Sequence, residues 1–92
     1  MHVLEKAGAI ELLLYLYRNG ETTFTNAVRS LKTGQAALYS AVSRLLEADL
    51  IKEERGETFP FTRKFKLTEK GRLVAEHLAK IEEILMDKSK ST

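Results

Sequence analysis

The sequence predicts a mainly α-helical domain that carries one small β-hairpin, an α+β fold. Two patterns lead to this prediction. Four segments repeat apolar residues at the three- and four-residue spacing of amphipathic helices, and two short runs after the third segment have the composition of strands. The 92 residues fit one domain by size, and no linker-like stretch divides residues 1–92.

The first predicted helix covers residues 3–18 and is stopped by Asn19-Gly20, residue types that accept a left-handed backbone. A helix with one buried face needs only three or four apolar residues per two turns. This helix carries apolar residues on both sides. We therefore expect one side to pack into the chain's own core and the other to contact a second surface.

The second and third predicted helices are separated by a tight turn at residues 32–34. Thr23 is the predicted N-cap of the second helix, which reaches Leu31, and Thr33 is the predicted N-cap of the third, which covers residues 33–48. The buried face of the third helix is marked by apolar residues spaced four and three: Leu38, Val42 and Leu45.

A β-hairpin is predicted over about residues 50–67, with strands at 50–55 and 63–67 and a loop at 56–62. The second strand alternates apolar and basic residues, the pattern of a half-exposed strand. We expect Phe65 and Leu67 to face inward while Lys64 and Lys66 face outward.

The fourth predicted helix begins after Thr68, its expected N-cap, and covers about residues 69–87. Its apolar residues are spaced four, three and four, as in the seam between two packed helices. The seam residues are Val74, Leu78, Ile81 and Leu85, and it is widened by Leu73, His77 and Ile84.

Two helices joined by a tight turn form the unit that places its second helix in the major groove of DNA. Here that recognition helix is the segment 33–48. The face opposite its apolar residues is small, polar and uncharged, with Arg44 at its edge; it consists of Gln35, Ala36, Tyr39, Ser40 and Ser43. Glutamine can pair with adenine, hydroxyls with several bases, and alanine with a thymine methyl group. This face is therefore the candidate base-reading surface.

Phosphate contacts are expected around the same helix and on the hairpin. Residues 22–72 contain ten lysine and arginine residues against six acids, a net of +4, whereas the whole chain has a formal net charge of +2. The start of the recognition helix offers backbone amides to a phosphate. The candidate phosphate contacts are Arg29, Lys32, Thr33, Gly34 and Arg44.

The first and fourth helices together predict a dimer, because both carry more apolar surface than one small domain can cover. The expected interface residues are Leu12, Leu16, Val74, His77, Leu78, Ile81, Ile84 and Leu85. A two-fold dimer would place two recognition helices about 34 Å apart, one turn of B-DNA. The alternative is that the fourth helix folds back on its own domain.

Two stretches carry a resemblance to a known family. "SRLLEADLIKEER" (43–55) and "KLTEKGR" (66–72) resemble the winged-helix transcriptional regulators of the MarR/PadR type, especially small archaeal winged-helix DNA-binding proteins. The resemblance implies a winged helix-turn-helix with a C-terminal dimerisation helix, whose hairpin, the wing, touches flanking DNA through Arg55, Arg63 and Lys64. The sequence departs from the pattern at Asp49, where glycine is usual, and in an apolar wing tip containing Pro60.

These observations predict a homodimeric, sequence-specific transcriptional regulator, with repression expected because no further domain is seen that would recruit polymerase. Two alternatives stay open: a weakly specific, chromatin-type DNA-binding protein and a winged-helix protein–protein adaptor. The partners expected are double-stranded DNA and a second copy of the chain.

Other classes of function lack a matching pattern in the sequence. The absence of cysteine excludes disulfides, thiol nucleophiles and cysteine-based zinc sites. No catalytic constellation, glycine-rich phosphate loop or metal-ligand cluster is recognisable, so we expect no enzyme activity, cofactor or metal. The most apolar run, 9–17, is too short to span a bilayer, and a cytoplasmic, nucleoid-associated protein is expected.

Overall fold

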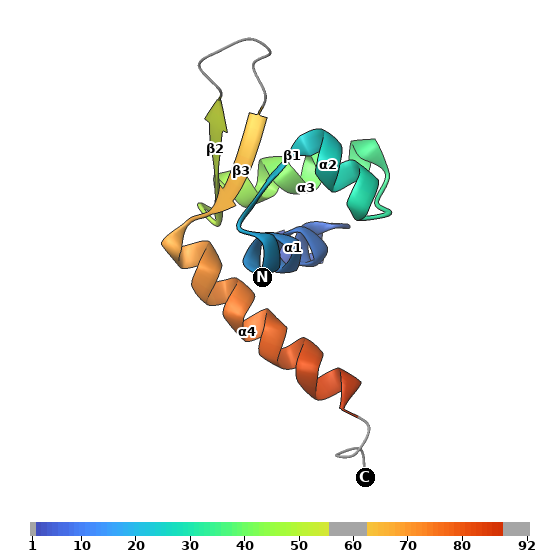
Figure 1. Ribbon diagram of the computed structural model, residues 1–92, viewed down its shortest axis with the longest axis vertical. Helices are drawn as coiled ribbons and strands as arrows, with labels where there is room; N and C mark the ends of the chain where they lie inside the picture. The colour runs from blue at the N-terminus through green and yellow to red at the C-terminus, as the bar shows by residue number, and fades with distance from the viewer. Residues whose placement is uncertain (1, 56–62, 88–92) are drawn as a thin grey trace.

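The computed structural model describes residues 2–55 and 63–87 and shows a winged-helix fold (Figure 1). Among the described residues, the first three α-helices lie beside a small antiparallel sheet, and the last α-helix extends from the end of the sheet. The elements in chain order are the 3₁₀ helix η1 (His2–Glu5), α1 (Ala9–Asn19), β1 (Glu21–Thr23), α2 (Phe24–Ser30), α3 (Gln35–Glu47), β2 (Ile51–Arg55), β3 (Arg63–Leu67) and α4 (Glu69–Met86). The loop predicted at 56–62 lies outside the described residues.

In the described part of the chain the sheet has three strands in the order β1-β3-β2, one more than the sequence predicts. In the hairpin, Ile51 pairs with Leu67 and Arg55 with Arg63, and the short β1 adds to the other edge of β3. The alternation predicted for the second strand is confirmed at Phe65, which is buried, and at Lys64, which is exposed.

The core is built mainly from α1 and α3. Leu12 and Leu16 have 0% and 1% of their surface exposed, and they belong to one buried cluster with Leu38, Leu45 and Phe65. The expectation that Leu12 and Leu16 lie on a dimer interface is therefore wrong for this conformation, because both side chains are buried within their own domain. An eleven-residue helix that contacts α3, α4 and the sheet buries more than one face without any partner chain.

The start of the first helix also differs from the prediction. Gly8 has a positive φ of 87°, which separates η1 from α1. Thr33 was expected to cap α3, but the N-cap is Gly34 and no side chain caps this end. Thr33 instead lies against Gly8: a Cβ atom on Gly8 would be 3.0 Å from the Thr33 Cγ2. The turn before α1 therefore supports the turn before α3.

The end of α3 explains the departure at Asp49. The Leu50 amide donates to the Leu45 carbonyl (3.0 Å) and the Asp49 amide to the Leu46 carbonyl (3.1 Å). These two bonds define a Schellman motif, whose left-handed position is usually glycine. Asp49 occupies that position with φ 61°. The turn thus keeps its geometry with an aspartate, one of the few other residues that tolerate it.

The start of α4 is fixed against the end of α3. The Thr68 side chain caps the helix, as predicted, by accepting a hydrogen bond from the Gly71 amide (2.9 Å). Gly71 is buried so closely that a Cβ atom there would lie 1.7 Å from the Leu50 carbonyl oxygen. From this junction α4 runs away from the sheet, on the side opposite the hairpin (Figure 1).

Candidate nucleic-acid interface

The exposed face of α3 has the composition that the sequence predicts. Its apolar residues Leu38, Val42 and Leu45 are buried against the core, as expected. The opposite face presents Gln35, Ala36, Tyr39 and Ser43 as exposed residues and Ser40 as half-buried. The helix therefore offers a hydroxyl- and amide-bearing surface without a carboxylate at its centre.

Tyr39 is the most prominent side chain of this face. It is 57% exposed, yet its ring packs edge-on against Phe24 of α2, with 5.9 Å between the ring centroids. An aromatic ring held on one side and open on the other presents its hydroxyl with little loss of side-chain entropy. Phe24 thus supports the candidate base-reading surface, a role that the sequence did not reveal.

The N-terminus of α3 is open. A Cβ atom on Gly34 would have no neighbour within 4 Å, and no side chain caps the helix. The first backbone amides of an α-helix have no partner within the helix, and they carry the positive end of its dipole. This end of α3 can therefore receive a phosphate oxygen from several directions.

The basic residues around α2 and α3 differ in whether they form an ion pair with an acidic side chain. In the described part of the chain, Arg29 and Lys32 have no ion-pair partner, whereas Arg44 lies 3.6 Å from Glu47. Arg29 also lines a shallow cleft of about 440 Å³ together with Lys64 and Thr25. Arg29 and Lys32 are thus the cations of this region that are most available to a phosphate.

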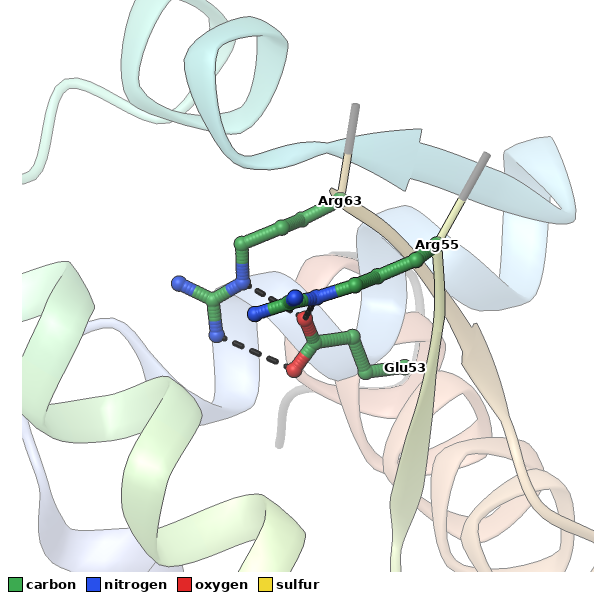
Figure 2. A network of polar contacts seen from close by, with 3 residues as sticks. All are labelled: Glu53, Arg55 and Arg63. Carbon is green, nitrogen blue, oxygen red and sulfur yellow. Dashed lines mark hydrogen bonds and ion pairs between the residues drawn. The ribbon is translucent and has the colours of Figure 1, made fainter. Parts of the chain in front are cut away.

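Arg55 and Arg63 of the wing lie on the same face of the hairpin as the strand residues that pack into the core. On β2 and β3 this face changes from buried Ile51 and Phe65 to the half-buried pair of Glu53 and Arg63 and to exposed Arg55. Figure 2 shows both guanidinium groups reaching the same carboxylate, Glu53. The two arginines expected to act on the wing are therefore brought together by an acid that the sequence analysis did not single out.

Lys64 lies on the other face of the hairpin, apart from these arginines. There it lies 3.9 Å from Glu21 of β1, and its neighbour Lys66 lies 3.6 Å from Glu21 and 3.5 Å from Glu54. The three predicted wing contacts therefore do not form one cationic row. The pairing with Glu21 was not foreseeable, because a three-residue strand leaves almost no pattern in a sequence.

Electrostatic shifts are concentrated at the pair on the inner face. The pKa of Glu53 is lowered, first by its hydrogen bonds from Arg63 and then by the charges of Arg63 and Arg55. The pKa of Arg63 is raised, chiefly by the Glu53 carboxylate, with a smaller contribution from the Tyr39 hydroxyl. The pairing with Glu53 is therefore the main electrostatic interaction of Arg63.

A second surface, at the far end of the molecule, is apolar. Along α4, Ile81, Ile84 and Leu85 are 52%, 65% and 78% exposed, and His77 is exposed beside them. Val74 and Leu78 are half-buried because they pack on the domain's own core. Further apolar members of this surface, absent from the predicted interface, are Leu4, Leu73 and Met86.

Residues 2–55 and 63–87 lack two other kinds of feature. No group of three or more histidine, cysteine, aspartate or glutamate side chains there could hold a metal ion. Within the same ranges, no helix has the length and apolar character needed to cross a membrane.

Comparison with known proteins places the fold among transcriptional regulators. No protein-family model and no curated relative matches the sequence. The transcriptional regulator homologue protein from Pyrococcus horikoshii OT3 superposes with a TM-score of 0.80 at 15% identity, over 99% of this chain and 91% of that one. Lactococcus lactis ZitR (C30AH42A mutant) has a TM-score of 0.80 at 26% identity, over 91% of this chain.

A third solved structure, the adhesin competence repressor AdcR from Streptococcus pyogenes, has a TM-score of 0.76 at 20% identity, over 91% of this chain. The chain spans 57% of the length of ZitR and 63% of the length of AdcR. The three likenesses agree with the geometry above: the chain has the winged-helix fold of transcriptional regulators.

Proposed function

We propose that this chain is a homodimeric, sequence-specific DNA-binding transcriptional regulator that acts as a repressor. The observation that carries the proposal is the exposed face of α3, where Gln35, Tyr39 and Ser43 present amide and hydroxyl groups on a helix supported from behind by the core. Such a face suits contact with base edges in the major groove, which admits one α-helix.

Contacts to the DNA backbone would surround this helix. Arg29 and Lys32 precede it on α2 and the following turn, and Gly34 opens its N-terminus. Thr33 and Arg44 flank the two ends of the helix. In this arrangement the backbone contacts set the register of the protein, and the α3 side chains read the sequence.

The wing would contact DNA beside the recognition helix, through Arg55 and Arg63 on one face and Lys64 on the other. AdcR, which shares this fold, is a repressor, and this supports the same role for this chain. A small domain bound over a promoter represses by occupying it, and this requires no additional domain.

The dimer is proposed through α4. Its exposed apolar residues continue from Leu73 to Leu85 on a helix that extends beyond the domain body. Large apolar side chains clustered in this way mark an interaction site. A second copy is the occupant we propose, because a two-fold dimer covers the same surface on both chains and gives the recognition helices a fixed spacing.

Two substitutions test base reading against backbone contact. Tyr39→Ala should reduce discrimination between preferred and altered duplexes by about 1–3 kcal/mol, since a base contact is lost. Arg29→Ala should weaken binding to all duplexes alike and reduce the slope of log K against log salt by about one. Titrations of labelled duplexes at several salt concentrations measure both. An equal loss on every duplex for Tyr39→Ala would contradict base reading by this residue.

A further inference from the structure

We infer that Glu53 is a positioning residue of the wing: it holds the guanidinium group of Arg63 beside the recognition helix, while Arg55 lies near the same carboxylate. The inference rests on the proposed DNA-binding function. It assigns a role to an acidic side chain that would not itself contact a phosphate, because the two charges have the same sign.

The contact between Glu53 and Arg63 has two prongs. Arg63 Nε donates to Glu53 Oε2 (2.6 Å), and Arg63 Nη2 donates to Glu53 Oε1 (3.1 Å). Arg55 Nε lies 3.9 Å from the same Oε2. All three side chains extend in the same direction from the two strands, toward the side of α2 and α3 (Figure 2). A two-pronged pair fixes the plane of a guanidinium group as well as its position.

The charge of the cluster favours a phosphate despite the acid. Two guanidinium groups and one carboxylate leave a net charge of +1. Without the carboxylate, the two cations repel each other and are free to separate. Arg63 uses two of its five N–H donors on Glu53, so three remain for another acceptor. Glu53 therefore concentrates positive charge while leaving part of each guanidinium group unused.

Arg63 is also supported from the core side. Its guanidinium carbon lies 5.3 Å from the centre of the Phe65 ring. With Glu53 on one side and the Phe65 ring on another, the position of Arg63 is set by two side chains of the hairpin.

Glu21 provides a charge-matched comparison. It also pairs with wing cations, but through single contacts of 3.9 Å to Lys64 and 3.6 Å to Lys66, and its side chain is 45% exposed, against 23% for Glu53. Loose, exposed pairs fix little geometry. Glu21 should therefore only reduce the local positive charge, so that Glu21→Gln and Glu53→Gln remove the same charge with opposite consequences.

The test measures affinity for a labelled duplex of mixed sequence at low salt. Glu21→Gln should bind roughly twofold more tightly than the wild type, because one repelling charge is gone. Glu53→Gln should bind about three- to tenfold more weakly, although it too loses a negative charge, because Arg63 is no longer held. The charge-preserving Glu53→Asp, which is one methylene shorter, should also bind more weakly than the wild type.

A double-mutant cycle with Arg63→Ala separates positioning from a general loss of structure. If Glu53 acts through Arg63, Glu53→Gln should cause no further loss in the Arg63→Ala background, whereas damage to the fold would persist there. The inference is overturned if Glu53→Gln binds more tightly, as Glu21→Gln does, or if Glu53→Asp binds like the wild type. A wild-type protein that does not bind the duplex would instead refute the proposed function itself.

Discussion

Replacing Gly71 by alanine tests how closely α4 is fitted to the end of α3. A Cβ atom at this position would lie 1.7 Å from the Leu50 carbonyl oxygen and 2.7 Å from its carbon. An ordinary contact between carbon and oxygen is about 3.3 Å or longer, so α4 or the Leu50 peptide must move by roughly 1.6 Å. Such a shift breaks the bond from the Thr68 amide to the Leu50 carbonyl (3.1 Å).

The expected loss of stability follows from these contacts. One or two hydrogen bonds at the cap contribute about 1 kcal/mol each, and forced overpacking costs about 1–3 kcal/mol. Alanine is the better helix former by about 1 kcal/mol, which offsets part of the loss. Gly71→Ala should therefore lower the free energy of unfolding by about 3 kcal/mol.

Thermal unfolding followed by circular dichroism measures this effect at a fixed protein concentration. A loss of about 3 kcal/mol corresponds to a melting temperature lower by roughly 12–24 °C in a domain of this size. Arg72→Ala, an exposed α4 position next to Gly71, is the control and should change little. If Gly71→Ala raised the melting temperature, as helix propensity alone predicts, the close approach of α4 to Leu50 would be refuted.

Three further predictions concern the turn, the apolar surface and the wing. Asp49→Gly should raise the free energy of unfolding by about 0.5–1 kcal/mol, because glycine takes the left-handed position with less strain; a lower melting temperature would contradict this. Ile84→Glu should leave the far-ultraviolet circular dichroism spectrum unchanged but weaken self-association at least 100-fold in sedimentation, because burying an isoleucine contributes about 1.5–3 kcal/mol per chain. An unchanged dimer would exclude the exposed apolar surface of α4 as the dimer interface. The pKa of Glu53 is lowered in the folded protein, so its ion pair contributes stability above the unfolded pKa, near 4.3, and this stability is lost as pH falls through the lower folded pKa. Unfolding measured over acid pH should show this loss in the wild type and not in Glu53→Gln. Identical curves for the two proteins would refute the prediction.

Much of the fold could be predicted because its helices and strands follow simple periodicities. The caps at Thr23 and Thr68 were correctly predicted, since each side-chain oxygen accepts from the amide three residues on. The prediction failed at Thr33, where contact with Gly8 prevails over capping. That contact joins segments far apart in the chain, so no local pattern predicts it.

The candidate interface was predicted as a set of residues but not as an arrangement. The exposed face of α3 followed from spacing alone, because burial of one helical face determines the other. The division of the wing cations between two faces follows from strand alternation, which places Arg63 and Lys64 on opposite sides. The role of Glu53 depends on the strand register, which pairs it with Phe65 and sets it diagonally across from Arg63. The expectation for Leu12 and Leu16 failed because the number of apolar residues on a helix indicates how much of its surface is buried. It does not indicate whether the same chain or a partner chain buries that surface.

Selection from a pool of random-sequence duplexes by the wild-type protein, followed by sequencing, would show at two salt concentrations whether the protein reads bases as a dimer. A dimeric, sequence-specific regulator should enrich an inverted repeat with half-sites about one helical turn apart, and the enrichment should persist at the higher salt. Salt-sensitive retention of every sequence alike would contradict base reading by α3 and favour a chromatin-type protein. No retention at either salt would refute DNA binding and favour a protein–protein adaptor.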